Sequence, residues 1–485
     1  MDIILLYLFG SLVIGMLMFF IKNRVINYLL FIPFFALQVL LNVHEIFHIN
    51  EIEGYYFGGD GEGYFKADGI GIIFLSVITI LVVPTVIHSY WYTKHRKETI
   101  GSISIYNLSL LLLISMMSCA LITRHVAMMW AFIEATTLAA SMLIYHERNH
   151  AALEATWKYI FVCSIGIAMS FVGILFLGIA AQDAKSLDLT FDALSQNARL
   201  MDPMWLKLTF LLIVTGYSVK MGLTPLFTVD IDAKDTAPSP VGALLSGGLL
   251  NVGFVAIFRF YEVFSKTEIL SWMNTVLMMV GMSSLFFATV YILRVKNIKR
   301  LLAYSSLEHA GIALIALASG GIGYFAVIFH LILHALAKSS LFFQVGQMIR
   351  VYRHKNIDLI SGYYKVNPWG GLVLILGFMA VLGIPPSGIF LTEFYTFKAL
   401  FMAKHYFVGL WALILLSIIF YGLSRDLLKV LFGEVPPSIT HRAVVVYPYE
   451  TISQWILLSI VFFLGLYPPA FLVEFIQMAV QDLPK

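Results

Sequence analysis

The sequence predicts an all-α integral membrane protein with about fourteen transmembrane helices. Three observations predict this fold class. The 485 residues are 60% hydrophobic and only 12% charged, their mean hydropathy is +0.87, and apolar runs of about 20 residues, enough to cross a hydrocarbon core about 30 Å thick, recur along the chain. No soluble globule could cover so much apolar surface with polar groups.

The apolar runs divide the chain into fourteen predicted spans. In chain order they cover 3–21, 25–43, 69–92, 105–122, 126–145, 159–180, 205–228, 240–264, 272–293, 301–318, 322–349, 370–400, 406–424 and 454–478. The first run has no basic start and no small-residue cleavage site before Lys22, so we expect it to remain as a span and not to be removed as a signal peptide.

The orientation follows from the lysine and arginine residues of the loops, which gather on the cytoplasmic side of a membrane. With loops alternating between the two sides, eighteen of these residues fall on one side and seven on the other. The acidic loop at 44–68 falls on the side with fewer basic residues. We therefore expect a multi-pass protein of a bacterial or archaeal cytoplasmic membrane, with both termini outside the cytoplasm.

Cysteine usage and net charge exclude several classes of protein. Cys119 and Cys163 both lie in apolar runs and are too few for a disulfide framework, an iron–sulfur cluster or a haem-thiolate site, so we interpret them as core residues. The net charge is +3, and basic residues do not interleave with aromatic ones, which argues against nucleic acid as a partner. We expect neither a metal nor a cofactor in this chain.

Six lysine or arginine residues are left after the loops are counted: five fall inside predicted spans, and Lys158 lies one residue before the sixth span. Four of them lie near span ends, where long side chains can reach the interface: Lys158, Lys207, Arg259 and Lys398. Lys220 and Lys338 lie well inside their spans, where a charge costs at least about 2.5 kcal/mol, and an ionisable residue at that depth is a candidate functional residue.

Glu134 and Lys220 are isolated ionisable residues in two of these spans. Glu134 lies mid-span, and Lys220 precedes Pro225, which breaks its helix. Broken helices at membrane depth line a cavity or are buried in protein, and burial enables a carboxyl group or an amine to exchange protons near neutral pH. The alternatives are a protonated Glu134 with one interhelical hydrogen bond and a permanent ion pair for Lys220.

His330, His334 and Lys338 follow one another at i, i+4 and i+8, so they form one polar stripe about 12 Å long on a single helix face. The two histidines suit a metal, but the helix offers no carboxylate as a third ligand. The spacing favours a proton wire. Glu308 and His309, near the start of the tenth span, are either members of the same relay or an interfacial pair at a helix start.

Glu393 follows a second helix break, at Pro385 and Pro386. Interrupted helices at corresponding positions of two halves indicate the ion site of a transporter built from repeats. The break at Pro225 lies in the seventh span and the second break in the twelfth. Spans four to eight and nine to thirteen therefore predict two inverted five-helix repeats, because an odd number of helices inverts the topology.

These repeats predict four parts of the chain. They are 1–104 with three helices and the acidic outer loop, 105–264 with the first repeat, 265–432 with the second, and 433–485 with a loop and the fourteenth helix.

The motifs resemble those of the antiporter-like, proton-conducting subunits shared by respiratory complex I, Mrp sodium/proton antiporters and membrane-bound nickel–iron hydrogenases. The resemblance covers about residues 70 to 430 and includes the segment 237–247, APSPVGALLSG. The family's ionisable positions are matched by Glu134, Lys220, His330, His334, Lys338 and Glu393. The segments 131–138, 157–159, 164–168 and 307–311 are most similar to the hydrogenase 4 component F branch.

Two departures from the family pattern concern the region after Pro225. The family segment resembles Met-His-x-Trp-Leu-Pro-Asp-Ala-His, whereas this chain has LFTVDIDAK at 226–234, which includes Asp232 and Lys234. In the eighth span Asn251 stands where many members carry Lys or His. Asn251 can hold water but cannot carry a proton. Asp232, Lys234 and Asn251 are accessory candidates for the relay.

The resemblance implies a non-catalytic subunit that moves protons while partner subunits transfer electrons. It implies other membrane subunits and peripheral iron–sulfur or hydrogenase subunits as partners, besides lipid. Three alternatives stay open: a sodium/proton antiporter subunit or an energy-coupling subunit for inorganic carbon uptake, a quinone-binding subunit, and a structural subunit whose charges are inert pairs.

Overall fold

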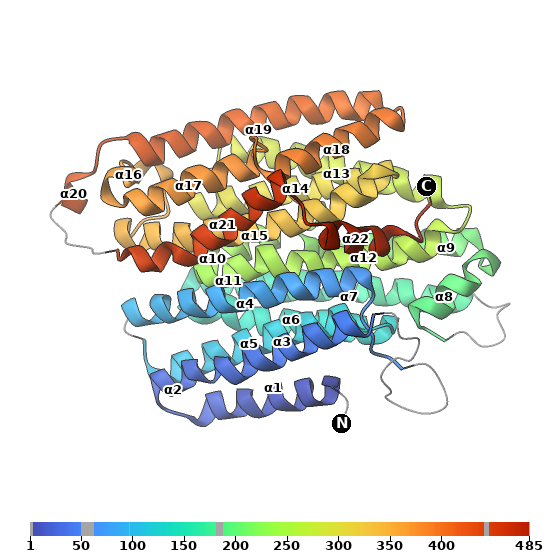
Figure 1. Cartoon of the computed structure of the whole chain (residues 1–485), viewed down its shortest axis with the longest axis horizontal. Helices are drawn as coiled ribbons and strands as arrows, with labels where there is room; N and C mark the ends of the chain where they lie inside the picture. The colour runs from blue at the N-terminus through green and yellow to red at the C-terminus, as the bar shows by residue number, and fades with distance from the viewer. Residues whose placement is uncertain (1–2, 50–62, 97, 181–187, 441–445, 485) are drawn as a thin grey trace. The chain divides into compact units, whose positions relative to one another are not determined.

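The computed structural model describes residues 3–49, 63–96, 98–180, 188–440 and 446–484. Within these ranges the regular elements are α-helices with short 3-10 and π-helical turns (Figure 1). The acidic loop predicted at 44–68 lies partly outside the described residues.

The chain divides into two compact units, which we describe separately. The first comprises Met1–Met221, Gly248–Val276 and Phe475–Pro484, and the second comprises Gly222–Gly247 and Leu277–Glu474. Helices of the first unit are α1 (Ile3–Phe20), α2 (Arg24–Leu29), α3 (Phe31–Phe47), α4 (Gly69–His95), α5 (Ile100–Ile122), α6 (Val126–Ile144), α7 (His150–Ala180), α8 (Phe191–Asn197), α9 (Pro203–Met221) and α12 (Leu250–Ser265).

Helices of the second unit are α10 (Thr228–Thr236), α11 (Ser239–Leu244), α14 (Ile298–Ser319), α15 (Ile322–Tyr352), α16 (Tyr363–Val366), α17 (Pro368–Val381), α18 (Gly388–Met402), α19 (Tyr406–Phe432), α20 (Pro437–Thr440) and α21 (Ile452–Leu466). Two further helices contribute residues to both units: α13 (Leu270–Ile292) and α22 (Ala470–Val480).

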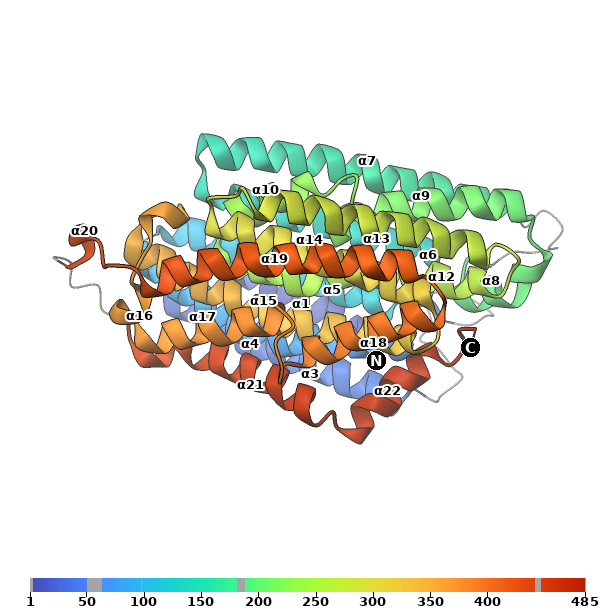
Figure 2. The same cartoon turned by 90° about the horizontal axis from the view of Figure 1, so that it is seen from above.

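The predicted membrane spans are confirmed. Among the described residues, 13 helical stretches are long and apolar enough to cross a membrane, and each coincides with one of the predicted spans. The remaining prediction, 370–400, corresponds to the consecutive helices α17 and α18, which follow one another in the second unit (Figure 2). The chain is therefore a multi-pass membrane protein with about fourteen spans.

Both predicted helix breaks are present, in the seventh and twelfth spans. The α9 helix ends at Met221, four residues before Pro225, and Gly222 has a φ of +73°. In the twelfth span α17 ends at Val381, Gly383 has a φ of +59°, and α18 begins at Gly388. Glycine adopts such positive φ values without steric cost, so each helix stops at a glycine before its proline is reached.

The second unit is built around α14 and α15. Nearly every residue of both helices is buried, whereas α19 leaves large apolar side chains such as Phe407, Trp411 and Tyr421 exposed. Exposed apolar side chains are expected on the lipid-facing helices of a membrane protein. The α14 and α15 helices therefore place polar side chains away from lipid.

Arg259, which is predicted to lie near a span end, is buried within the protein and paired with Asp68. Arg259 lies in α12, is 2% exposed, and forms a bidentate ion pair with Asp68 through Nε–Oδ2 at 2.9 Å and Nη2–Oδ1 at 2.8 Å. Its guanidinium also donates hydrogen bonds to the carbonyl oxygens of Ala120, Leu121 and Thr123. Arg259 thus satisfies carbonyl groups that the end of α5 leaves unpaired.

Replacing Arg259 with methionine should lower the thermal stability of the chain. The variant loses the ion pair and leaves three carbonyl groups without their donor, at a cost on the order of 3 kcal/mol. The midpoint of thermal unfolding of the purified chain in detergent measures this loss. An exposed arginine of the same unit, changed in Arg199→Met, is the matched control, and an equal effect of both substitutions would contradict the buried role of Arg259.

Candidate functional site

The first unit holds a buried polar cluster contributed by α6, α7 and α9. Lys220 is 2% exposed, and its Nζ donates a hydrogen bond to Thr137 Oγ1 at 2.6 Å. The Thr137 hydroxyl in turn donates to Glu134 Oε2 at 3.1 Å. The other carboxylate oxygen of Glu134 accepts a hydrogen bond from Ser164 Oγ at 3.0 Å, and the Lys220 ammonium lies 5.4 Å from the ring centre of Tyr159.

Thr137 therefore joins the two ionisable groups that the sequence singles out. A hydroxyl group has one donor and two acceptor positions, so it can accept from the lysine and donate to the carboxylate at the same time. The connection between Lys220 and Glu134 is a hydrogen-bonded chain through one side chain. The sequence analysis missed Thr137 and Ser164; the position of Thr137, three residues after Glu134 on the same helix face, is the signal that could have identified it.

The second unit holds a larger buried cluster contributed by α14, α15 and α18. His309 Nδ1 lies 3.1 Å from His330 Nε2, and His330 Nδ1 lies 2.8 Å from Thr392 Oγ1. The His309 ring also lies against His334, with ring centres 5.1 Å apart. His309 therefore contacts both histidines of the predicted stripe and is a central member of the cluster.

Glu308 and Lys338 extend this cluster along α14 and α15. Glu308 is 2% exposed in the middle of α14 and accepts a hydrogen bond from Ser305 at 3.3 Å, so it does not lie at a helix start. Lys338 is fully buried and donates to the carbonyl oxygen of Leu302 at 3.2 Å.

Glu393 occupies a different position from the histidines. It follows Thr392 in α18, but its carboxylate lies against Gly383 at the break of the twelfth span. A Cβ atom at position 383 would meet this carboxylate, and the φ of +59° there is one that glycine adopts without strain. Thr392, which the sequence analysis missed, makes the hydrogen bond to His330, whereas Glu393 lies at the helix break.

The accessory candidates differ in their surroundings. Asn251 is buried in α12 of the first unit. In the second unit Asp232 forms an ion pair with Arg300, while Lys234 is fully buried and forms an ion pair with Asp230 at 2.6 Å. Lys234 lies in the short helix α10, in the connection between the seventh and eighth spans.

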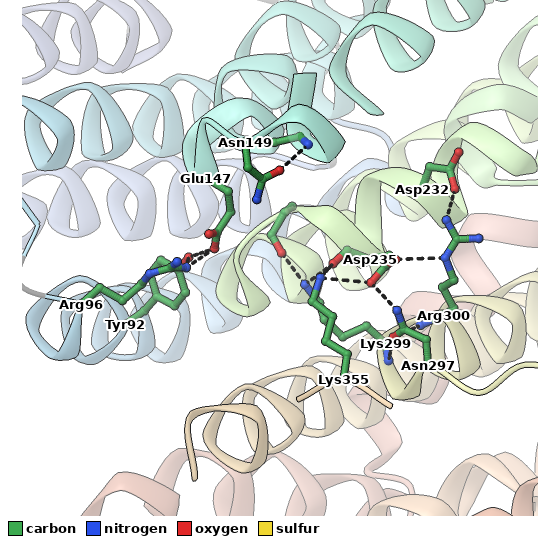
Figure 3. A network of polar contacts seen from close by, with 12 residues as sticks. Tyr92, Arg96, Glu147, Asn149, Asp232, Asp235, Asn297, Lys299, Arg300 and Lys355 are labelled. Carbon is green, nitrogen blue, oxygen red and sulfur yellow. Dashed lines mark hydrogen bonds and ion pairs between the residues drawn. The ribbon is translucent and has the colours of Figure 1, made fainter. Parts of the chain in front are cut away.

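An ionic network surrounds Asp235, the residue that follows Lys234 in α10 (Figure 3). Asp235 bonds Asn297 and Arg300 at 2.9 Å each and forms an ion pair with Lys355 at 3.2 Å. Burial alone would raise the pKa of Asp235, but Lys355, Lys299 and Arg300 hold the pKa of this carboxyl below its usual value. The network therefore anchors α10 to the start of α14.

The chemistry available to both clusters is proton exchange. Carboxyl, imidazole and amine groups each bind and release a proton, and the Thr137 hydroxyl continues the hydrogen-bonded chain between Glu134 and Lys220. Within the described residues, no group of three or more histidine, cysteine, aspartate or glutamate residues is arranged to hold a metal ion.

Comparisons with known proteins agree with this architecture. Residues 123–419 match the model of the family described as NADH:quinone oxidoreductase/Mrp antiporter, TM. The chain is 32% identical over 380 residues to the hydrogenase-4 component F homolog of Methylacidiphilum infernorum, an alignment that covers 76% of this chain and 79% of the relative.

Two solved structures share the fold. A chain of the membrane-bound sulfane sulfur reductase, an archaeal respiratory membrane complex, superposes with a TM-score of 0.87 at 23% identity, over 99% of this chain and 96% of that one. A chain of the Mrp complex from Dietzia sp. DQ12-45-1b superposes with a TM-score of 0.84 at 16% identity, over 99% and 97%.

Replacing Thr137 with valine should destabilise the chain. Valine has nearly the same shape but lacks the hydroxyl oxygen that accepts the hydrogen bond from the Lys220 ammonium, and a lost hydrogen bond to a buried charge costs about 1.5 to 3 kcal/mol. Thermal unfolding in detergent measures the change. The control is Thr136→Val, because the Thr136 hydroxyl donates to the Ile133 carbonyl of its own helix. Equal unfolding midpoints of the two variants would show that the hydrogen bond from Lys220 to Thr137 does not stabilise the chain.

Proposed function

This chain belongs to the NADH:quinone oxidoreductase/Mrp antiporter transmembrane family, and on that premise we propose that it is a proton-translocating subunit of a respiratory-type redox complex. The observation that carries the proposal is the pair of buried, hydrogen-bonded clusters, each composed of groups that exchange protons. A buried charge in a membrane protein is costly and marks an ion or proton pathway.

In the first unit Glu134 and Lys220 would form a switch. A nearby carboxylate stabilises the protonated ammonium, so any change in the Lys220–Thr137–Glu134 chain changes how tightly Lys220 holds its proton. In the second unit the stripe of His330, His334 and Lys338 would move the proton along α15, with His309 as a further member. Glu393 would take part at the break of the twelfth span.

The electron transfer would take place in partner subunits. We assign no redox centre to this chain; other membrane subunits and peripheral iron–sulfur or hydrogenase subunits would carry that chemistry. This part of the proposal is supported by the likeness to a hydrogenase component and to a chain of an archaeal respiratory membrane complex. The complex would lie in a bacterial or archaeal cytoplasmic membrane, with both termini of this chain outside the cytoplasm.

A second candidate function is that of a sodium/proton antiporter subunit, which the likeness to the Mrp complex favours. The two functions share the same polar groups but differ in the ion moved. Proton uptake that persists in sodium-free medium favours the redox-coupled proton subunit. Uptake that requires sodium favours the antiporter.

Replacing Lys220 with alanine should abolish proton movement and leave the chain in its complex. Alanine removes the ammonium group that bonds Thr137, so the switch in the first unit is lost. Proton uptake by inside-out membrane vesicles, followed with a pH-sensitive dye after addition of H₂ or NADH, measures the effect. Lys207→Ala, at an exposed position of the same helix, is the control.

Undiminished uptake by the Lys220→Ala vesicles, with normal amounts of the chain in the membrane, would overturn the proposed function.

A further inference from the structure

A polar cavity of about 250 Å³ lies within the first unit, where several of its spans end. It is bounded by the residues before α4, the residues after α5, the start of α8, and parts of α12 and α22. This volume equals that of about eight water molecules in the liquid, so the cavity has room for a group larger than a single water molecule. Its charged lining residues are Lys66, Asp68, Arg124, Asp192 and Arg259.

Arg259 and Asp68 form a closed wall of this cavity. Their bidentate ion pair and three backbone carbonyl groups together engage all three nitrogens of the Arg259 guanidinium. Asp68 Oδ1 also accepts a hydrogen bond from the backbone N–H of Gly71 at 2.8 Å and so caps the start of α4. The two charges neutralise each other, and the hydrogen bonds of both groups are used within the protein.

Arg124 lines the same cavity with incomplete hydrogen bonding. One terminal nitrogen of its guanidinium, Nη2, forms an ion pair with Asp192. The other, Nη1, is buried and has no acceptor within the part of the chain that the structure describes. A buried guanidinium nitrogen without an acceptor is costly. This atom therefore points to a ligand that brings an oxygen to Arg124.

The charges of the lining favour an anionic ligand. Lys66 adds a third basic side chain, so basic lining residues outnumber acidic ones by three to two. Gly69, the first residue of the 27-residue helix α4, also lines the cavity. The N-terminus of a long helix carries partial positive charge, which adds to the attraction for an anion.

The place of the cavity indicates which anion it suits. Lys66 lies in the segment before α4 and Arg124 in the segment after α5, at the level where spans end and lipid headgroups lie. A phosphate carries several oxygens in a tetrahedral arrangement, so it can accept from a guanidinium and an ammonium at once. The lining also includes apolar side chains, namely Ile49, Phe191 and Met478.

We propose that this cavity binds a phosphate group through Arg124 and Lys66. The same chemistry is present in a phospholipid headgroup and in free phosphate, and the test below separates these two sources. Asp192 holds one side of the Arg124 guanidinium and repels an anion, so it limits the affinity of the site. A bound phosphate would join the segment before α4 to the segment after α5. The inference needs no proton transfer and does not depend on the proposed function.

The test measures dissociation constants with the full-length chain purified in detergent. The midpoint of thermal unfolding is followed as phosphatidylglycerol, diacylglycerol or sodium phosphate is added at constant ionic strength, because a ligand of the folded state raises this midpoint. Phosphatidylglycerol should raise it, whereas diacylglycerol, which lacks the phosphate, should not. A rise with phosphatidylglycerol alone identifies a lipid headgroup as the source, and a rise with sodium phosphate identifies free phosphate as sufficient.

Two substitutions at the cavity should change the dissociation constant in opposite directions. Arg124→Met removes the guanidinium and should raise it at least about tenfold, the effect of one lost hydrogen bond between charged groups. Asp192→Asn keeps the size of the side chain but removes the competing negative charge, so it should lower the dissociation constant. Arg199→Met removes an exposed arginine of the same unit and should leave it unchanged.

The inference is overturned if neither phosphatidylglycerol nor sodium phosphate raises the midpoint, or if the unaltered chain and Arg124→Met bind equally well. A lipid effect that diacylglycerol reproduces, with no effect of sodium phosphate, has the same meaning. If Arg124→Met does not fold, Asp192→Asn decides in its place, and binding that is unchanged or weaker in that variant contradicts a phosphate held by Arg124.

Discussion

A polar or charged group in the hydrocarbon region of a membrane needs a partner within the protein, and the structure of this chain depends on that constraint. Thirteen described helices are apolar enough to cross a membrane, yet Lys220, Glu308 and Lys338 are buried in them. Each of these residues has a hydroxyl or carbonyl partner on its own helix or on an adjacent one.

The two units satisfy the constraint by different means. In the first, the Thr137 hydroxyl connects an ammonium group to a carboxylate, so the two charges stabilise each other through a hydrogen-bonded chain. In the second, two imidazole rings and then a hydroxyl group follow one another from His309 through His330 to Thr392. Both arrangements link proton-exchanging groups through hydrogen bonds, so a proton can move along the same hydrogen bonds that hold these side chains in place.

Much of the fold could be predicted from the sequence, because membrane spans depend on the length and apolarity of single segments. The spans and both helix breaks are examples. Partners that come from distant segments could not be predicted. Arg259 is the clearest case, since it bonds carbonyl groups about 140 residues earlier in the chain, and no periodicity in α12 indicates which helix end it will cap.

In the candidate site, too, spacing within one helix could be predicted from the sequence, whereas contacts between helices could not. Spacing along α15 placed His330, His334 and Lys338 on one face, but it could not show that His309 of α14 faces that stripe. Helical spacing likewise cannot show that a threonine will join Glu134 to Lys220. The sequence likewise could not show that the polar segment between the seventh and eighth spans forms the helix α10, in which Lys234 is buried and paired with Asp230.

The most direct test of the account is proton uptake by vesicles that carry Glu134→Gln. Glutamine keeps one oxygen, which can accept the hydrogen bond from Thr137, and its amide group can donate to the Ser164 hydroxyl, but it cannot ionise. The account predicts that the chain assembles with unchanged thermal stability and that proton uptake per electron is lost. Undiminished uptake would mean that the buried carboxylate is an inert structural partner, which would contradict the claim that these clusters move protons.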